Sequence, residues 1–227
     1  MAKKLTRKQL LKEPDEFITF TGKLIRFGRA HQRKITWILS GLVLLVFAFS
    51  GFRYLSGVNE QKASARLGEL MSRYQALSGQ KSPSEAYDAV KQDFEEMLET
   101  HGGKKATRLA RFAYANMGYD AGDYQHAIAL YNRSLADFDQ SPFYRTLILD
   151  KIGHAKAEEK DIASAISSFV TVADKAGYFL QDEALFLLGN LYESGGNSEK
   201  SKAAFDRILS DHAGSAYVAL TRERPAG

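Results

Sequence analysis

The side chains most able to carry metal or acid–base chemistry in this sequence are five histidines: His31, His101, His126, His154 and His212. We assign a metal-ligand spacing to one of them. His154 and Glu158 lie four residues apart and share a helix face. Two ligands alone do not complete a metal site. The acid- and glycine-rich stretch "YDAGDYQ" at residues 119–125 is too short for a calcium-binding loop and is typical of a tight turn.

Other catalytic patterns are missing from the chain. There is no cysteine, which excludes disulfides, thiolate zinc sites and cysteine nucleophiles. No glycine-rich phosphate-binding loop, dinucleotide-binding fingerprint or serine nucleophile elbow occurs. We therefore predict no catalytic residue, no metal site and no cofactor, and we expect a protein that is not an enzyme. An enzyme built on a helical scaffold stays an alternative.

The charge is divided unevenly along the chain. Residues 1–34 hold ten Lys/Arg and three Asp/Glu, a net charge of +7, whereas residues 54–227 hold 20 Lys/Arg and 24 Asp/Glu, a net charge of −4. The basic residues thus precede an uncharged run at residues 35–52. Because the large C-terminal part is slightly acidic, we expect no nucleic-acid partner for it.

The uncharged run "ITWILSGLVLLVFAFSGF" has the length of a membrane span. Its 18 residues would form a helix of about 27 Å, close to the roughly 30 Å of bilayer hydrocarbon. We predict a transmembrane helix over residues 35–55, with charged and aromatic anchors at its two ends: Arg33, Lys34, Trp37, Arg53 and Tyr54. A cleaved signal sequence and a buried core helix are the alternatives. The long segment before the run and the missing polar face argue against them.

The basic residues also predict an orientation. Ten precede the run and only four lie in residues 53–73, which places the N-terminus in the cytoplasm and the C-terminal part across the membrane. In a bacterium this is a single-pass inner-membrane protein with a periplasmic domain. Within the basic tail of residues 1–34, Phe17, Phe20, Leu24 and Phe27 recur at three- and four-residue steps. They predict an amphipathic helix on the cytoplasmic membrane face, with a solvated basic tail as the alternative.

Residues 56–107 are predicted to form a helical linker or a divergent helix pair. Ser82, Pro83 and Glu85 supply helix-start signals. The apolar side chains that follow share one helix face: Tyr87, Val90, Phe94 and Met97. No stretch of the chain shows sustained alternation of apolar and polar residues, so we expect an all-α protein.

A repeat begins near residue 108. The stretches "GDYQHAIALYNRSL", "KDIASAISSFVTVA" and "GNSEKSKAAFDRIL" each carry a small residue four positions before an aromatic one: Ala127 and Tyr131, Ala165 and Phe169, Ser201 and Phe205. An upstream helix in each unit has a small residue at one position: Ala115, Gly153 and Gly189. A helix pair that recurs at this spacing is typical of a helical solenoid, whose units bury their apolar faces by stacking. We predict three repeats over residues 108–215 and a tail over residues 216–227.

The last unit, "LGNLYESGGNSEKSKAAFDRIL", resembles a tetratricopeptide repeat (TPR) in the spacing of its small and aromatic residues. The sequence "YDAGDYQHAIALYNRSL" matches the second half of such a repeat, whereas Ala115, Gly118 and Lys156 depart from the usual residues. The predicted fold class is therefore all-α, with a single N-terminal transmembrane helix followed by a TPR-like helical solenoid.

The order of these parts resembles the ancillary subunit of the bacterial Sec translocon, a membrane-anchored TPR-like protein, although the basic tail here is longer. The resemblance implies an adaptor or chaperone-like protein on the periplasmic side. Its partners would be translocon or envelope-complex subunits, or translocating polypeptides. A self-associating structural scaffold is the alternative that keeps an interaction role.

Resemblance to TPR proteins also implies a groove lined by the first helix of each pair. The corresponding residues are Phe112, Asn116 and Tyr119, then Asp150, His154 and Glu158, then Phe186, Asn190 and Glu193. Phe112 and Phe186 stand where some TPR domains carry basic residues that clamp a C-terminal carboxylate, so we do not expect that ligand. A mixed aromatic and acidic groove suits an extended, partly apolar or basic polypeptide. The alternative is that these residues only pack the repeats.

Overall fold

The computed structural model describes residues 16–223, and side chains from residue 20 onward. Half of the basic residues of the predicted cytoplasmic tail, and the side chain of Phe17, lie outside this description. Residues 16–223 contain helices and turns but no β-strand, as predicted. The chain divides into two compact units, residues 1–58 and residues 59–227, which are described one at a time.

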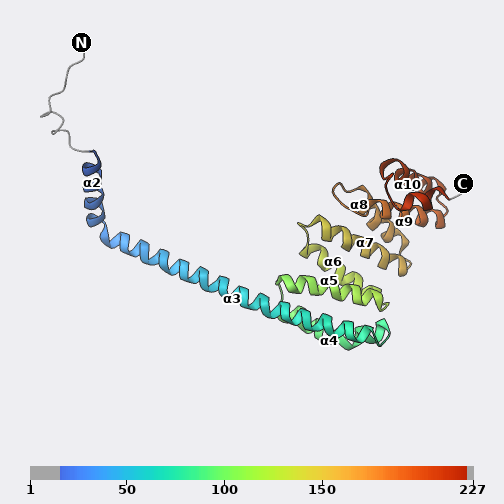
Figure 1. Ribbon diagram of the computed structural model, residues 1–227, viewed down its shortest axis with the longest axis horizontal. Coiled ribbons are helices and arrows are strands. Elements are labelled where there is room, and N and C mark those ends of the chain that lie inside the picture. The colour runs from blue at the N-terminus through green and yellow to red at the C-terminus, as the bar shows by residue number, and fades with distance from the viewer. Residues whose placement is uncertain (1–15, 224–227) are drawn as a thin grey trace, which may run out of the picture. The chain divides into compact units, whose positions relative to one another are not determined.

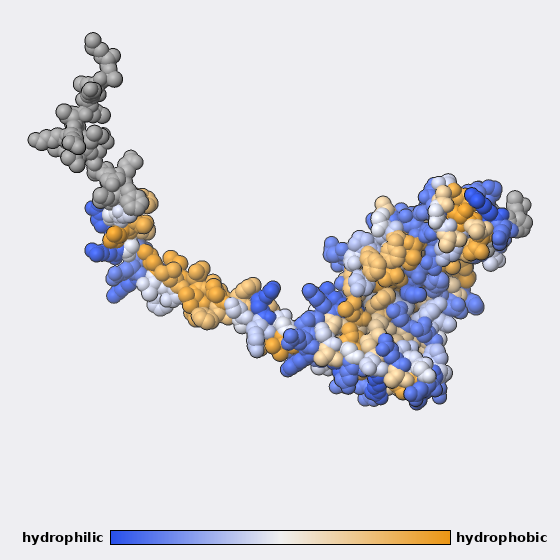
Figure 2. Space-filling view, in the orientation of Figure 1, coloured by the Kyte–Doolittle hydropathy of each residue, from blue (hydrophilic) through white to orange (hydrophobic). Residues whose placement is uncertain are grey.

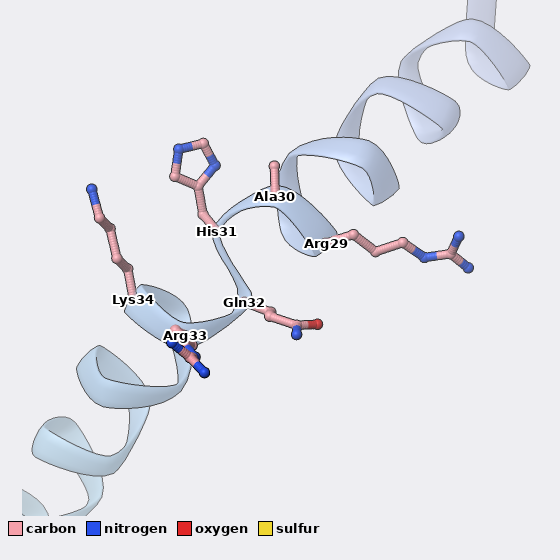
Figure 3. A pocket seen from close by; sticks show the side chains of 6 residues that line it. All are labelled: Arg29, Ala30, His31, Gln32, Arg33 and Lys34. Atoms are coloured by element: carbon pink, nitrogen blue, oxygen red, sulfur yellow. The ribbon is translucent and has the colours of Figure 1, made fainter.

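The first unit contains α2 (Glu16–Ala30) and the beginning of α3 (Gln32–Ser78). A helix is thus present where the three- and four-residue spacing predicted one. Its apolar side chains Phe20, Leu24 and Phe27 are all exposed. Arg29 to Lys34, where α2 gives way to α3, line a shallow surface pocket, and their side chains point outward in different directions (Figure 3).

α3 extends well beyond the predicted span of residues 35–55. Its apolar stretch is exposed throughout, with Trp37 at 78%, Phe47 at 72% and Phe52 at 71% of their full accessible surface. Figure 2 shows this stretch as a hydrophobic band along α3. A contiguous apolar surface of this kind is unusual on a protein surface in water. α3 is long and apolar enough to cross a membrane, and the crossing itself stays a prediction.

The second unit is a stack of helices in which each helix from α5 onward packs on its predecessor (Figure 1). It contains the part of α3 from residue 59, followed by α4 (Pro83–Thr100), α5 (Lys105–Asp120), α6 (Tyr124–Asp137), α7 (Pro142–Glu158), α8 (Ile162–Asp174), α9 (Gln181–Ser194), α10 (Ser198–Asp211) and α11 (Tyr217–Arg222). The pairs α5–α6, α7–α8 and α9–α10 are the three repeats, and the expected helical solenoid is confirmed.

The same turn joins the two helices of every repeat. A residue with left-handed backbone comes first: Gly122 (φ 82°), Lys160 (φ 66°) and Gly196 (φ 72°). The next residue then caps the second helix by accepting a hydrogen bond from a backbone N–H three residues on: Asp123, Asp161 and Asn197. The acid- and glycine-rich stretch at residues 119–125 is therefore a tight turn, as predicted. Leu180, before α9, is the other non-glycine residue with left-handed backbone in the described chain (φ 63°).

Helix α4 and the adjoining part of α3 form a helix pair that packs on the first repeat. Ser82 and Glu85 form the predicted capping box, and Phe94 is fully buried against Tyr114 of α5. The Glu60 carboxylate accepts hydrogen bonds from the backbone N–H groups of Ala106 (2.9 Å) and Lys105 (3.1 Å). These bonds, chiefly that from Ala106, lower the pKa of Glu60. Glu60 thereby caps the helix that starts the repeats.

The C-terminal segment at residues 216–227, predicted as a tail, includes the short helix α11. Its residue Tyr217 stacks on Phe186 of α9 with ring centroids 4.9 Å apart, and Thr221 is buried. α11 contacts both α9 and α10 and covers part of the last repeat. The segment was predicted as a tail because it is short for a capping helix, and the helix that it forms has only six residues.

The two helices of a repeat approach most closely at the predicted small residues. A Cβ atom added at Gly153 would lie 2.6 Å from Cε1 of Phe169, and one at Gly189 would lie 2.3 Å from Cε1 of Phe205. Phe169 and Phe205 are both buried. Only glycine leaves room for these rings, so the small residues at Gly153 and Gly189 let the two helices of each repeat approach closely.

Replacement of Gly189 by alanine should therefore destabilise the last repeat. The methyl group forces Phe205 out of its place, and after the gain in helix propensity we expect a net loss of about 1–2 kcal/mol in the free energy of unfolding. The matched control is Gly118→Ala in α5, because a Cβ there would lie 3.5 Å from the nearest atom of Tyr87. Urea unfolding followed by circular dichroism measures both. Equal stability of Gly189→Ala and wild type would contradict the close approach.

Candidate binding groove

The predicted groove residues lie on the first helices of the three repeats: α5, α7 and α9. On α5, Asn116 is already engaged inside the repeat, because Tyr131 of α6 donates its hydroxyl hydrogen bond to Asn116 Oδ1 at 2.7 Å. Burial raises the pKa of Tyr131, which keeps the hydroxyl protonated as a donor. The carbonyl oxygen of Asn116 thus positions Tyr131, and its amide group is the part left for a ligand.

Phe112 and Phe186 contribute to packing between helices. The ring of Phe112 lies 6.0 Å from that of Tyr131 and 6.4 Å from that of Tyr144. The ring of Phe186 lies 6.0 Å from that of Phe205 and stacks on Tyr217. Both phenylalanines are half-buried. Both rings thus contribute to packing between helices, and their role in a groove stays a prediction.

The exposed part of the groove is rich in carboxylates. Glu158 and Glu193, each near the end of its first helix, are exposed. Tyr119 is half-buried beneath the Lys151 ammonium group, which lies 5.9 Å from the ring centroid. Burial, with a smaller contribution from the Glu158 charge, raises the pKa of Tyr119. This surface therefore presents exposed acidic groups, with the Tyr119 ring already paired with Lys151.

The structure brings Asp150 and His154 of α7 together with a residue that the sequence analysis did not select, Glu183 of α9. One ligand atom from each lies within 4.8 Å of the others. Asp150 is 5% exposed, and its Oδ1 lies 3.6 Å from Nε2 of His154. The spacing of Asp150 and His154, four residues apart, was a sequence signal for such a pair. Glu183 had no local signal, because only the stacking of α9 on the preceding repeat brings it there.

Asp150 is electrostatically strained. Burial, the largest cause, raises the pKa of its carboxyl group, and the charge of Glu183 raises it further, whereas His154 and Lys151 lower it. Within residues 20–223, no group hydrogen-bonds to its buried Oδ1 atom. A buried carboxylate oxygen without a donor is costly, so this position calls for a proton or a cation.

The predicted membrane anchors occupy the first unit. Arg33 and Lys34 lie in the first turn of α3, and Trp37 follows one turn later on an exposed face. Arg53 and Tyr54 are exposed at the far end of the apolar stretch. The structure contains no membrane, so the role of these residues as anchors stays a prediction.

The three stacked helix pairs define a helical-repeat protein. Comparison with family models agrees, since residues 27–223 match the tetratricopeptide repeat-like domain. The chain belongs to this family, whose domains generally mediate protein–protein interactions and are typically not catalytic. The match also covers α4 and the apolar stretch of α3, beyond the three predicted repeats. No curated protein matches the chain.

The buried position of Asp150 gives a stability prediction with a definite pH dependence. A carboxyl group whose pKa is raised on folding favours the folded state while it is protonated, and this contribution is lost as the pH rises through the folded-state pKa. Asp150→Asn keeps the shape and removes the charge. In buffer containing a chelator, we expect the variant to be more stable than wild type at pH 7 by about 1 kcal/mol.

The advantage of Asp150→Asn should shrink as the pH falls toward 4, because the wild-type carboxyl group then becomes protonated. Urea unfolding at several pH values measures the difference, and Asp139→Asn, at an exposed position, is the control. A variant less stable than wild type at pH 7, or a difference that does not change with pH, would refute this account of Asp150.

Proposed function

We propose that this protein is a single-pass, membrane-anchored TPR-like adaptor that binds polypeptides or membrane-complex subunits on the periplasmic side of a bacterial inner membrane. The observation that carries the proposal is the combination, in one chain, of an exposed apolar helix and a repeat solenoid with an acidic, aromatic groove. The first would fix the protein in the bilayer, and the second offers a surface for a partner.

Several features support the anchor. The exposed apolar stretch of α3 is bordered by Arg33 and Lys34 on one side and by Arg53 on the other. α2 adds exposed Phe20, Leu24 and Phe27 beside Arg26 and Arg29. This arrangement suits a helix at the headgroup level of a membrane with anionic lipids.

The partner class follows from the groove. Exposed carboxylates at Glu158 and Glu193, with Tyr119 alongside, favour an extended polypeptide that carries basic and apolar side chains. Translocating polypeptides have this character while they are unfolded. The order of parts along the chain resembles the ancillary Sec translocon subunit, and this resemblance supports a place beside the secretion machinery and a chaperone-like role.

A self-associating scaffold is the second candidate. Phe143 of α7 and Phe179, in the segment before α9, stack with ring centroids 5.1 Å apart and stay 56% and 38% exposed. An exposed aromatic pair of this kind is a common feature of protein contact surfaces. A second copy of the chain is one partner that such a pair could meet.

The adaptor function predicts that partners crosslink through the groove. A photo-crosslinking amino acid at Glu158 or Glu193 of the full chain should capture other envelope proteins or nascent secretory polypeptides in intact cells. The control places the same amino acid at Ser167 of α8 or Lys202 of α10, which are exposed on second helices. These positions should capture few other proteins. Mass spectrometry identifies the products.

Equal capture from both sets of positions would argue against a binding groove. If the groove positions yield only crosslinks between copies of this chain, the adaptor function fails and the self-associating scaffold takes its place.

The predicted topology is tested separately. Alkaline phosphatase fused after Gly227 should be active, because the enzyme folds only after export, whereas a green fluorescent protein at the same point should be dark. Replacement of Arg33 and Lys34 by glutamine should leave this result unchanged, since eight more basic residues precede them. Phosphatase fused after Ala30, without the apolar stretch, is the cytoplasmic control. A fluorescent full-length fusion would overturn both the orientation and the periplasmic function.

A further inference from the structure

The cluster of Asp150, His154 and Glu183 has the composition of a metal site. It offers two carboxylates and one imidazole from two helices of neighbouring repeats. Carboxylate oxygen and imidazole nitrogen are the usual protein ligands of Zn²⁺ and of related first-row ions. Among the described residues this is the one group of three such side chains whose ligand atoms converge.

The geometry of the cluster is close to that of a bound ion. Ligands about 2.1 Å from a tetrahedral metal lie roughly 3.4 Å from one another. Asp150 Oδ1 and His154 Nε2 are separated by 3.6 Å, and all three ligand atoms lie within 4.8 Å of one another. A shift of Glu183 by about one ångström would complete the set, which is within the reach of a half-buried glutamate side chain.

An independent observation points to a ligand at this place. The Oδ1 atom of Asp150 is buried, and within residues 20–223 no donor lies within hydrogen-bond distance of it, since Nε2 of His154, at 3.6 Å, is just beyond that distance. The Asp150 side chain as a whole is 7% exposed. Buried polar atoms in folded proteins are almost always satisfied, and a cation among these three groups would satisfy this one.

The surroundings also hold the ligands in place. The ring of His154 meets that of Phe169 edge-on, with centroids 5.3 Å apart. Phe169 is itself fixed against Gly153. These two contacts limit the movement of the His154 ring.

We propose that Asp150, His154 and Glu183 form a binding site for a divalent first-row transition-metal ion, with Zn²⁺ as the best match to one imidazole and two carboxylates. The imidazole disfavours Mg²⁺ and Ca²⁺, which select oxygen ligands. Three protein ligands leave a coordination position for water or for a group of a bound partner. The ion would join α7 to α9 and so link the second and third repeats at the groove.

The metal site does not depend on the proposed adaptor function, since an ion can bind whether or not a polypeptide occupies the groove. The test uses the full chain in detergent micelles, without a polyhistidine tag and freed of metal by a chelator. Isothermal titration calorimetry with Zn²⁺ at pH 7.5 should show one ion per chain with a dissociation constant of about 10 μM or tighter. Mg²⁺ at the same concentrations should give no comparable signal.

Variants locate the ion. His154→Gln and Glu183→Gln should each weaken Zn²⁺ binding about tenfold or more, because each removes one ligand. The matched controls His212→Gln and Glu199→Gln lie outside the cluster and should bind as wild type does. Circular dichroism of every variant checks that the helices are intact. The proposal is overturned if wild type binds no Zn²⁺ at about 1 mM, or if the two ligand variants with intact helices bind as tightly as wild type.

Discussion

The contact on which the solenoid depends is the approach of an aromatic ring to the backbone of the preceding helix. Phe169 lies on Gly153, and Phe205 lies on Gly189, at distances that leave no room for a side chain on the first helix. Each ring packs between the two helices of its own repeat. A single helix pair cannot bury its own apolar face, so the pairs must stack on one another. In the first repeat Tyr131 is fully buried and bonds Asn116 of the first helix, and Ala115 stands where the other repeats have glycine.

Stacking decides which polar groups are available for function. Because the first helices lie next to one another, their side chains form one surface, but part of that surface is used internally. Asn116 accepts a hydrogen bond from Tyr131, and Phe186 packs on Tyr217. Among the residues predicted for the groove, the exposed carboxylates are Glu158 and Glu193.

Local patterns in the sequence predicted most of the helices, and contacts between repeats were harder to predict. The capping box of Ser82 and the turn around Gly122 depend on residues a few positions apart, and both were found. The small–aromatic pairs recur at a fixed spacing, which also made them visible. Glu183 and α11 escaped notice because their roles come from neighbours about 30 residues away in the chain, such as Asp150 and Phe186. No local period encodes such distances.

The two non-glycine residues with left-handed backbone, Lys160 and Leu180, stand on either side of α8. A residue with a Cβ atom adopts that conformation at a cost of roughly 1–2 kcal/mol, which the equivalent turns at Gly122 and Gly196 avoid. Both connections of α8 to its neighbours therefore carry this conformational cost. The middle repeat is thus the one whose backbone is least favourable at its ends, and its stability depends more on side-chain packing than that of the flanking repeats.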